Sequence, residues 1–222
     1  MRGVVWFRTD LRIDDNPALI NALDNCEEVI GIYIFSQLQW KAHNESNVKL
    51  EFLLKNLILL EKSLSKLNIP LITIETDSFD SLPRDLCSFV VANKVSHIFW
   101  NNEFGVNESK RDLLSCTILE KENVKTSRFD DQVIYEPGYL KTGQGKPFSV
   151  FTPFKRRWIE NFEMDFLDIN YKHSVKKPIN LISDLSKIKF IRTHSVNMDL
   201  WPAGEGAARE RLSNFLSQKA KS

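Results

Sequence analysis

The residues best suited to chemistry are Asn107 and Glu108, which follow a short apolar run at 97–100 and open a helical pattern. A carboxylate in this place can accept two parallel hydrogen bonds from a flat molecule with two adjacent donors, such as the amino group and ring N–H of a pterin. A structural role is also open, because Asn107 could cap the helix and Glu108 would place a negative charge at its positive end. The residues alone favour the structural role.

A second candidate is His43, which lies in the segment 39–44 after another apolar run. A histidine ring can stack on a heteroaromatic ligand or hydrogen-bond to it, although a single histidine in a loop more often lies on the surface or caps a local turn. We expect this segment to be such a loop. Loops that follow two different strands need not be adjacent, so the sequence does not join His43 to Glu108.

Several familiar site patterns are missing from the sequence. No GxGxxG follows the first apolar run and no GxxxxGK[ST] occurs, which disfavours an ordinary dinucleotide site and a P-loop. The segment GQGK at 143–146 resembles a phosphate-binding loop only weakly, because no strand precedes it and a proline follows. The four histidines and three cysteines lack metal-ligand spacing, so we predict no metal site and interpret the cysteines as small buried thiols.

Short apolar runs alternate with helical patterns along the first part of the chain, as expected for parallel βαβ units. The clearest helical pattern covers 49–67, where leucines recur on one face, and Asn16 followed by Pro17 is typical of a helix start. The predicted fold is α/β, a five-stranded parallel Rossmann-like doubly wound sheet with ligands at its carboxyl edge. The predicted strands are 4–7, 29–35, 71–75, 97–100 and 124–129.

The alternation stops near residue 130, where prolines and glycines become frequent. We predict an α/β domain over 1–130, an extended interdomain arm over 131–200, and the first helix of a further helical domain within 201–222. The arm is expected to hold one helix at 153–164, and the last helix is expected at 203–219. One side of that last helix is apolar and needs a partner to be buried. Its apolar residues are Ala208, Leu212, Phe215 and Leu216.

Charge divides the chain into two parts. Residues 1–140 hold 15 Lys/Arg and 21 Asp/Glu, a net charge of −6, whereas residues 141–222 hold 15 and 8, a net charge of +7. The basic part could approach a nucleic acid, but its charges are scattered in the sequence and an ordinary solvated surface is favoured. No apolar run approaches the roughly 20 residues of a membrane helix, and the first residues lack a leader pattern. We therefore expect a cytoplasmic protein that does not contact a membrane.

Five motifs, in their order and spacing, carry a family resemblance: WFRTDLRIDDNPAL, QWKAHN, VNESKRD, FDDQVIYEPG and VFTPFKRRW. They resemble the amino-terminal α/β domain of the DNA photolyase and cryptochrome family, and are most similar to bacterial folate-using photolyases that repair cyclobutane pyrimidine dimers. The resemblance implies an antenna chromophore, 5,10-methenyltetrahydrofolate, in contact with His43, Asn107 and Glu108. It also implies that FAD and damaged DNA belong to a helical domain that follows, so this chain would supply one wall of the folate pocket and no catalytic residue.

The leading hypothesis is therefore a light-harvesting part of a deoxyribodipyrimidine photolyase, a carbon–carbon lyase, that does not repair DNA alone. The alternative is a non-catalytic fragment or interaction subunit that docks its last helix onto a separate helical flavin-domain partner. A third hypothesis, an adenine-nucleotide-binding α/β protein, lacks a glycine-rich phosphate loop. We interpret Arg8, Asp10 and Arg12 as residues that brace the domain by charge pairing, and the five tryptophans as core residues.

Overall fold

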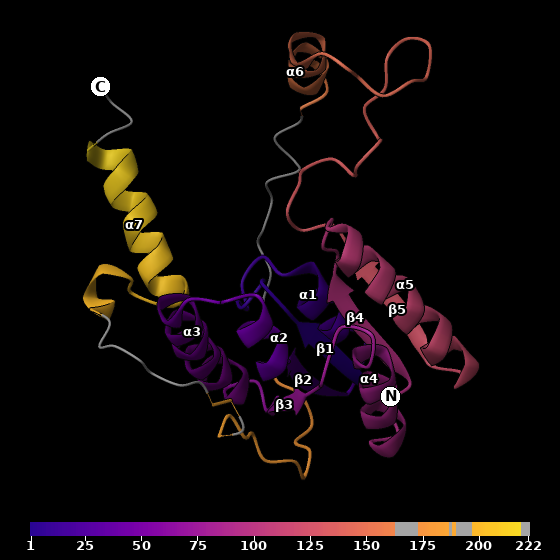
Figure 1. The fold of residues 1–222 in the computed structure, drawn as a ribbon, viewed down its shortest axis with the longest axis vertical. Helices are drawn as coiled ribbons and strands as arrows, with labels where there is room; N and C mark the ends of the chain where they lie inside the picture. The colour runs from indigo at the N-terminus through magenta and orange to yellow at the C-terminus, as the bar shows by residue number, and fades with distance from the viewer. Residues whose placement is uncertain (163–172, 187, 190–196, 219–222) are drawn as a thin grey trace.

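The computed structural model describes residues 1–162, 173–186, 188–189 and 197–218. Its centre is a parallel sheet of five strands in the order β3-β2-β1-β4-β5 (Figure 1). The predicted α/β fold and all five predicted strands are confirmed, and the ends shift by one or two residues at most. The strands are β1 (Arg2–Phe7), β2 (Glu28–Phe35), β3 (Leu71–Glu75), β4 (His97–Asn101) and β5 (Lys125–Phe129).

Both faces of the sheet are covered by helices, which are α1 (Pro17–Asn25), α3 (Asn47–Ser65), α4 (Leu82–Ala92) and α5 (Val106–Lys121). Successive side chains along a strand point to opposite faces, so each central strand contributes to two cores. In β1, Val5 and Phe7 pack in the core beneath α1 and α3. Val4 and Trp6 pack in the opposite core with residues of α4 and α5. The sheet is therefore doubly wound, as predicted.

Two helix starts follow from side-chain caps that satisfy free backbone N–H groups. Asn16 accepts a hydrogen bond from the Leu19 N–H at 3.2 Å, and Pro17 is the first residue of α1, as expected. Ser46 accepts a hydrogen bond from the Lys49 N–H at 3.3 Å. This cap explains why α3 begins at residue 47 rather than at the predicted 49.

The segment after β2, expected to be a loop, instead forms the short helix α2 (Gln37–Ala42). Ser36 caps it, accepting a hydrogen bond from the Gln39 N–H at 3.2 Å. The helix has no buried residue, so no apolar periodicity in the sequence could indicate it. His43 ends α2, and its backbone N–H donates to Gln39 O at 2.9 Å.

Beyond β5 the chain leaves the sheet and forms a projecting segment that includes α6 (Phe151–Glu160) (Figure 1). The predicted end of this helix, at Met164, lies outside the described residues. Residues 173–186 lie back against the sheet domain, where Thr73 Oγ1 donates to Asp184 O at 2.5 Å. The domain boundaries at 130 and 200 stay predictions.

The last helix, α7 (Glu205–Gln218), follows a short 3-10 helix at Met198–Leu200. Its predicted end at Lys219 falls outside the described part of the chain. The apolar residues expected on one side are exposed, with Leu212, Phe215 and Leu216 each more than half accessible to solvent. Among the helices that the structure describes, none combines the length and the apolar character needed to cross a membrane.

The tryptophans have different environments, so their common interpretation as core residues is partly wrong. Trp6 and Trp100 are fully buried and pack edge to face, with ring centroids 5.7 Å apart. Trp40 packs against the core and stacks on Phe35. Trp158 lies in the projecting segment, where it packs edge to face on Tyr135, and Trp201 is 50% exposed. Of the cysteines, two are buried as expected and Cys116 is half-buried.

Candidate functional site

A cavity of about 760 Å³ opens at the carboxyl edge of the sheet. The strand order places the end of β1 between the ends of β2 and β4, so loops that follow all three strands meet there. Open α/β sheets bind ligands at this edge, where the direction of the strand order reverses. The structure therefore has a cavity at the edge of the sheet where the sequence predicted a ligand site.

All three predicted site residues line this cavity. His43 reaches it from the end of α2, whereas Asn107 and Glu108 reach it from the first turn of α5. The sequence could not join His43 to Glu108, since their strands are separated in the sheet by β1. The cavity joins them because α2 and α5 both begin at the same edge of the sheet.

The start of α5 decides between the two interpretations of Asn107. The N-cap is Gly105 and the first helical residue is Val106, so Asn107 does not have the capping role that the sequence left open for it. Glu108 does lie in the first turn, where its charge is favourable. Its carboxylate lies against Gly105, since a Cβ added there would be 1.9 Å from Glu108 Oε2.

The three side chains are available to a ligand. In the part of the chain that the structure describes, His43, Asn107 and Glu108 make no side-chain hydrogen bond or ion pair. His43 and Asn107 are exposed at the rim, and Glu108 is half-buried. A carboxylate, an amide and an imidazole together offer acceptors, donors and a flat ring to a heterocycle.

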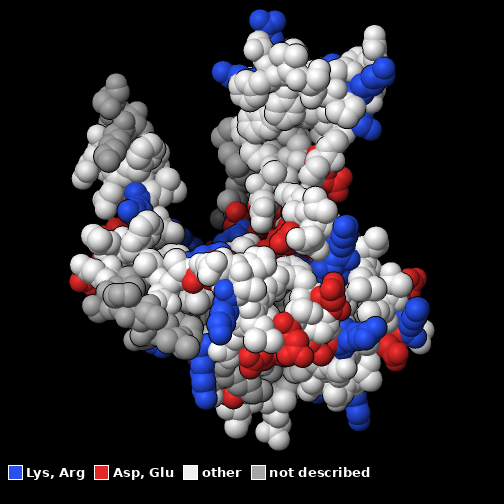
Figure 2. Space-filling model, in the orientation of Figure 1, with Lys and Arg blue, Asp and Glu red and all other residues white. Residues whose placement is uncertain are grey.

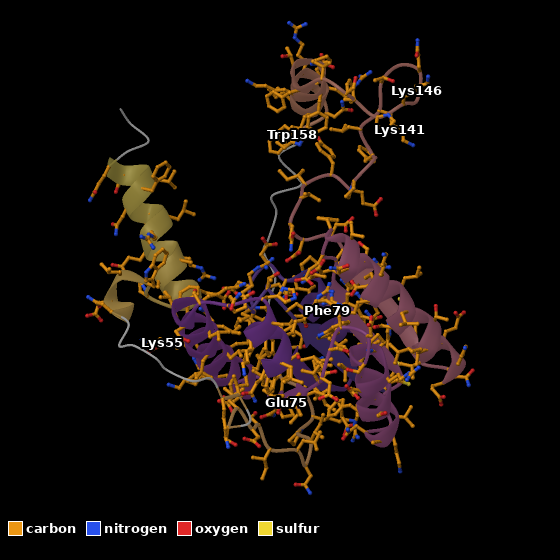
Figure 3. All side chains as sticks on the ribbon, viewed as in Figure 1. Lys55, Glu75, Phe79, Lys141, Lys146 and Trp158 are labelled. Carbon is orange, nitrogen blue, oxygen red and sulfur yellow. The ribbon has the colours of Figure 1, made fainter. Side chains whose placement is uncertain are left out.

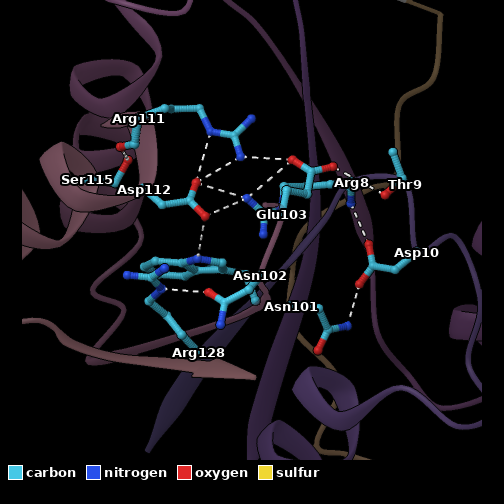
Figure 4. Close-up of polar contacts among 11 residues, drawn as sticks. Arg8, Thr9, Asp10, Asn101, Asn102, Glu103, Arg111, Asp112, Ser115 and Arg128 are labelled. Carbon is cyan, nitrogen blue, oxygen red and sulfur yellow. Dashed lines mark hydrogen bonds and ion pairs between the residues drawn. The ribbon is translucent and has the colours of Figure 1, made fainter. Parts of the chain in front are cut away.

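Beneath the rim, the floor of the cavity rests on four buried or nearly buried charged residues, which we call the buried charge network: Arg8, Glu103, Arg111 and Asp112 (Figure 4). Asp112 is completely buried and accepts hydrogen bonds from Arg8 Nη1 at 2.8 and 2.9 Å. It also accepts from Arg111 Nε at 3.0 Å and from Trp100 Nε1 at 3.2 Å. Glu103 accepts from Arg111 Nη2 at 3.0 Å.

Aromatic rings complete this floor. The guanidinium groups of Arg8 and Arg111 lie 5.0 and 4.8 Å from the centroid of the Trp6 ring, within the range of cation–π attraction. Arg111 also lies 5.2 Å from the ring of Phe79, which is labelled in Figure 3 on the loop that follows β3. The ring of Trp6 explains how Arg8 Nη2 can be buried without a hydrogen-bond partner.

Arg8 and Arg12 brace the domain by charge pairing, as predicted, whereas Asp10 does so through hydrogen bonds to uncharged groups. The Asp10 carboxylate accepts hydrogen bonds from the Arg8 N–H at 2.7 Å and from Asn101 Nδ2 at 2.5 Å. Burial raises the pKa of Asp10 above its ordinary value, and these hydrogen bonds oppose the rise. Arg12 Nη1 forms an ion pair with Asp131 at 2.9 Å. These contacts tie the ends of β1 and β4 to the segment that leaves β5.

Sequence reasoning missed one wall of the cavity, which the first turns of α7 provide through residues such as Ala208 and Arg211. Glu205 attaches this helix to the loop after β1 by accepting from the backbone N–H of Ile13 at 3.1 Å and of Asp14 at 3.0 Å. Gly204, with φ +91°, allows a close approach to α3, where an added Cβ would lie 2.7 Å from Leu59 Cδ1. In the sequence, Gly204 before the helix was a signal for this close approach.

Tyr33 is a further residue that sequence reasoning missed. It lies near the end of β2 and lines the cavity. Burial raises the pKa of its hydroxyl above the ordinary value of 10.0, and the negative charges of Glu103 and Glu45 add to this effect. The hydroxyl therefore stays protonated near neutral pH and can donate a hydrogen bond.

Comparison with known proteins identifies the family of this chain. Residues 3–176 match the family model for DNA photolyase. The chain belongs to this family. The photolyase-family chain is 32% identical to the deoxyribodipyrimidine photo-lyase of Vibrio cholerae over 226 residues, which cover 98% of the chain and 47% of that relative. It is 38% identical to the Escherichia coli deoxyribodipyrimidine photo-lyase over 158 residues, which cover 71% of the chain and 33% of that relative.

Solved structures of photolyases and cryptochromes share the fold. A bacterial class III photolyase from Agrobacterium tumefaciens aligns with a TM-score of 0.77 at 24% identity, over 97% of this chain and 44% of that one. A cryptochrome from Synechocystis aligns with a TM-score of 0.70 at 16% identity, over 97% of this chain and 46% of that one. The chain thus spans about half the length of the relatives that it matches over nearly its whole length.

Proposed function

We propose that this chain is the antenna-binding part of a deoxyribodipyrimidine photolyase, and that its cavity holds 5,10-methenyltetrahydrofolate. The observation that carries the proposal is the meeting of His43, Asn107 and Glu108 in one cavity at the carboxyl edge of the sheet. When bound, this folate absorbs near-ultraviolet and blue light and passes the energy to a flavin.

The residues present suit such a ligand. The cavity volume of about 760 Å³ lies within the range of roughly 300–1,000 Å³ that is typical of small-molecule sites. Glu108 would accept the two parallel hydrogen bonds of the pterin donor edge, and Asn107 can donate and accept beside it. His43 would stack on the heterocycle or hydrogen-bond to it at the rim. The buried charge network and Trp6 would hold the floor rigid beneath the ligand.

The reaction itself is proposed for the whole protein. A helical domain, in the same chain or in a separate one, would hold FAD and bind the damaged DNA, and this chain would contribute absorption and scaffold. In this proposal residues 1–130 form the antenna domain, 131–200 the interdomain arm, and 201–222 the start of the helical domain, in a protein of the cytoplasm. The relatives are named deoxyribodipyrimidine photo-lyases, which supports this assignment.

The test is a titration of the purified chain with 5,10-methenyltetrahydrofolate, followed by near-ultraviolet absorption. We expect Glu108→Ala to weaken binding at least tenfold, since a hydrogen bond to a charged group contributes roughly 1.5–3 kcal/mol. Glu120→Ala, at an exposed position of the same helix, is the matched control and should bind like the unaltered chain. If the unaltered chain takes up no folate, the antenna assignment is wrong for this chain.

A second candidate function is supported by the exposed apolar side of α7. Leu212, Phe215 and Leu216 are all more than half exposed, as expected for a helix that docks onto a separate helical flavin-domain partner. Mixing the chain with a separately produced flavin domain should then restore light-driven repair of a pyrimidine dimer. The idea fails if size-exclusion chromatography of the mixture shows no complex.

A further inference from the structure

Four titratable or charged side chains hold the start of α7 against the rest of the protein, and we call them the latch: Asp14, His173, Glu205 and Arg209. Asp14 lies at its centre. One oxygen of its carboxylate pairs with Arg209, and the other lies 2.8 Å from His173 Nε2. The latch therefore joins three segments that are far apart in the sequence, which are the loop after β1, the segment 173–186 and α7.

Glu205 completes the latch through the backbone of the same loop. Its two carboxylate oxygens accept hydrogen bonds from consecutive N–H groups, from Ile13 at 3.1 Å and from Asp14 at 3.0 Å. One residue earlier, the Gly204 N–H donates to Asn56 Oδ1 of α3 at 2.9 Å. The start of α7 is thus attached at two places, the loop after β1 and α3.

The outer part of α7 is not attached in this way. The helix has no buried residue, and among the described residues its hydrogen bonds and ion pairs to other elements come only from Glu205 and Arg209. Residues 212–218 carry no charge, and Figure 2 shows blue side chains at the base of α7 and white ones along its outer half. A helix without buried side chains gains little from packing, so its position depends on the contacts at its first two turns.

The contacts of the latch are of a kind that breaks and re-forms. The side chains of Asp14 and Arg209 are 44% and 64% exposed. Exposed ion pairs contribute little to stability, because water screens the charges and the long side chains lose freedom. Segments with few buried apolar contacts also open locally at a much lower cost in free energy than the core. We therefore expect the latch to open while the sheet stays folded.

The latch determines the position of one wall of the cavity. Ala208 and Arg211 line the cavity from α7, whereas Glu108 lines it from α5, which packs on the sheet. Asp14 and Arg209 lie outside the lining of the cavity. They can therefore act on a ligand only through the position of the helix, as positioning residues.

We infer that the latch makes α7 a movable wall of the cavity. The helix lies along a bound ligand while the latch is made, and it swings away as a unit when the latch breaks. A ligand that touches both α7 and the fixed wall binds the closed state better, so ligand binding and latch closure favour each other by the same factor. The identity of that ligand rests on the proposed function, whereas the movement of α7 does not.

The test is hydrogen exchange of single amides, measured by NMR on the full chain. The amides of Ile13 and Asp14 report the latch, and the amide of Gly204 reports the attachment to α3. Arg209→Gln removes the ion pair, Arg209→Lys keeps the charge, and both leave the lining of the cavity unchanged. Glu210→Gln, at an exposed position of the same helix, is the matched control.

We expect Arg209→Gln to speed exchange at all three amides by the same factor, about two- to fivefold, which is the range for an exposed ion pair. Arg209→Lys should restore slow exchange, and Glu210→Gln should leave it unchanged. Glu205→Ala removes two hydrogen bonds to a charged group and should speed exchange of the Gly204 amide at least tenfold, although that amide bonds to α3. A common response at both attachments shows that the wall moves as a unit.

Addition of ligand provides the second measurement. At a free 5,10-methenyltetrahydrofolate concentration of about 100 times its Kd, exchange at the same three amides should slow about 100-fold, because a ligand that binds only the closed state stabilises it in proportion to its concentration. The Gly145 amide, which donates to Thr142 O in the projecting segment outside the cavity, should exchange as before.

Three outcomes would overturn the inference: no faster exchange in Arg209→Gln, faster exchange at Ile13 and Asp14 without a change at Gly204, or bound folate that leaves exchange at these amides unchanged. The first two would show that α7 does not move as a unit about the latch. A chain that takes up no folate contradicts the proposed function, and the variants at Arg209 and Glu205 then decide the movement of α7 by themselves.

Discussion

The buried charge network and the projecting segment of residues 135–162, the outer arm, both carry arginines, and they differ in whether those charges are paired. In the network, Arg8 and Arg111 are almost fully buried and share the Asp112 carboxylate. In the outer arm, exposed cations such as Lys141 and Arg156 form no ion pair among the described residues. A buried charge must be paired because desolvation is costly, whereas an exposed charge can stay free for a partner. The first region therefore serves stability, and the second keeps its charges in contact with solvent.

The largest effect is expected at the centre of the network. Asp112→Ala leaves two buried guanidinium groups and Trp100 Nε1 without their common acceptor, and should lower the free energy of unfolding by about 3–5 kcal/mol. Urea unfolding followed by circular dichroism measures this loss. Lys141→Ala in the outer arm should change the same quantity by less than about 0.5 kcal/mol. A loss below about 1 kcal/mol for Asp112→Ala would break the contrast between the two regions.

The next effect is a pH dependence that originates in the sheet interior. Burial lowers the pKa of His97 from 6.5 to about 4, and the charge of Lys125 adds to the shift. The unfolded chain binds a proton below about pH 6.5 while folded His97 stays neutral, so the free energy of unfolding should fall as the pH drops from 6.5 towards 4. The total loss is about 3 kcal/mol, at roughly 1.4 kcal/mol for each pKa unit.

This dependence is isolated by difference. Urea unfolding at several pH values should show a shallower acid-side slope for His97→Gln than for the unaltered chain, and His43→Gln, at an exposed position, is the control. Parallel slopes for the unaltered chain and His97→Gln would show that this histidine is not held neutral by the core.

The smallest effect is expected on the exposed side of α7. Phe215→Ser, at a side chain that is 53% exposed, should change the free energy of unfolding by no more than about 0.5 kcal/mol. Leu57→Ala, at a fully buried position of α3, should cost about 2–5 kcal/mol in the same assay. A large loss for Phe215→Ser would mean that α7 packs against this chain and is not a free surface.

Local chemistry made much of the fold predictable. The runs that form β1 to β4 are short and mainly apolar, Asn16 caps α1, and leucines at helical spacing mark α3, so nearby residues contain the information needed. Prediction of helix positions and helix starts failed where neighbouring residues gave no pattern or a misleading one. Helix α2 buries no residue, and the N-cap of α5 is Gly105, whereas the residues had left this role open for Asn107.

The residues of the candidate site could be predicted one by one, but the sequence did not show that they lie in one cavity. Alignment of the motifs with a family pointed to His43, Asn107 and Glu108, but their meeting depends on a strand order that no single segment encodes. The wall from α7 depends on a contact between Glu205 and the loop after β1, nearly the full length of the chain away. Such contacts follow from chain topology, which spacing along the sequence does not specify.

By itself, the sequence determined the type and order of the elements and the family, because apolar periodicity, caps and motifs are properties of neighbouring residues. Only the tertiary structure decided which charges are paired and which are free. Arg8 and Asp112 lie 104 positions apart and form a buried pair, whereas five basic residues between 141 and 157 stay exposed on the outer arm. The physical reason is that pairing and desolvation depend on distances in space, which the fold sets when it brings strand ends together and projects one segment into solvent.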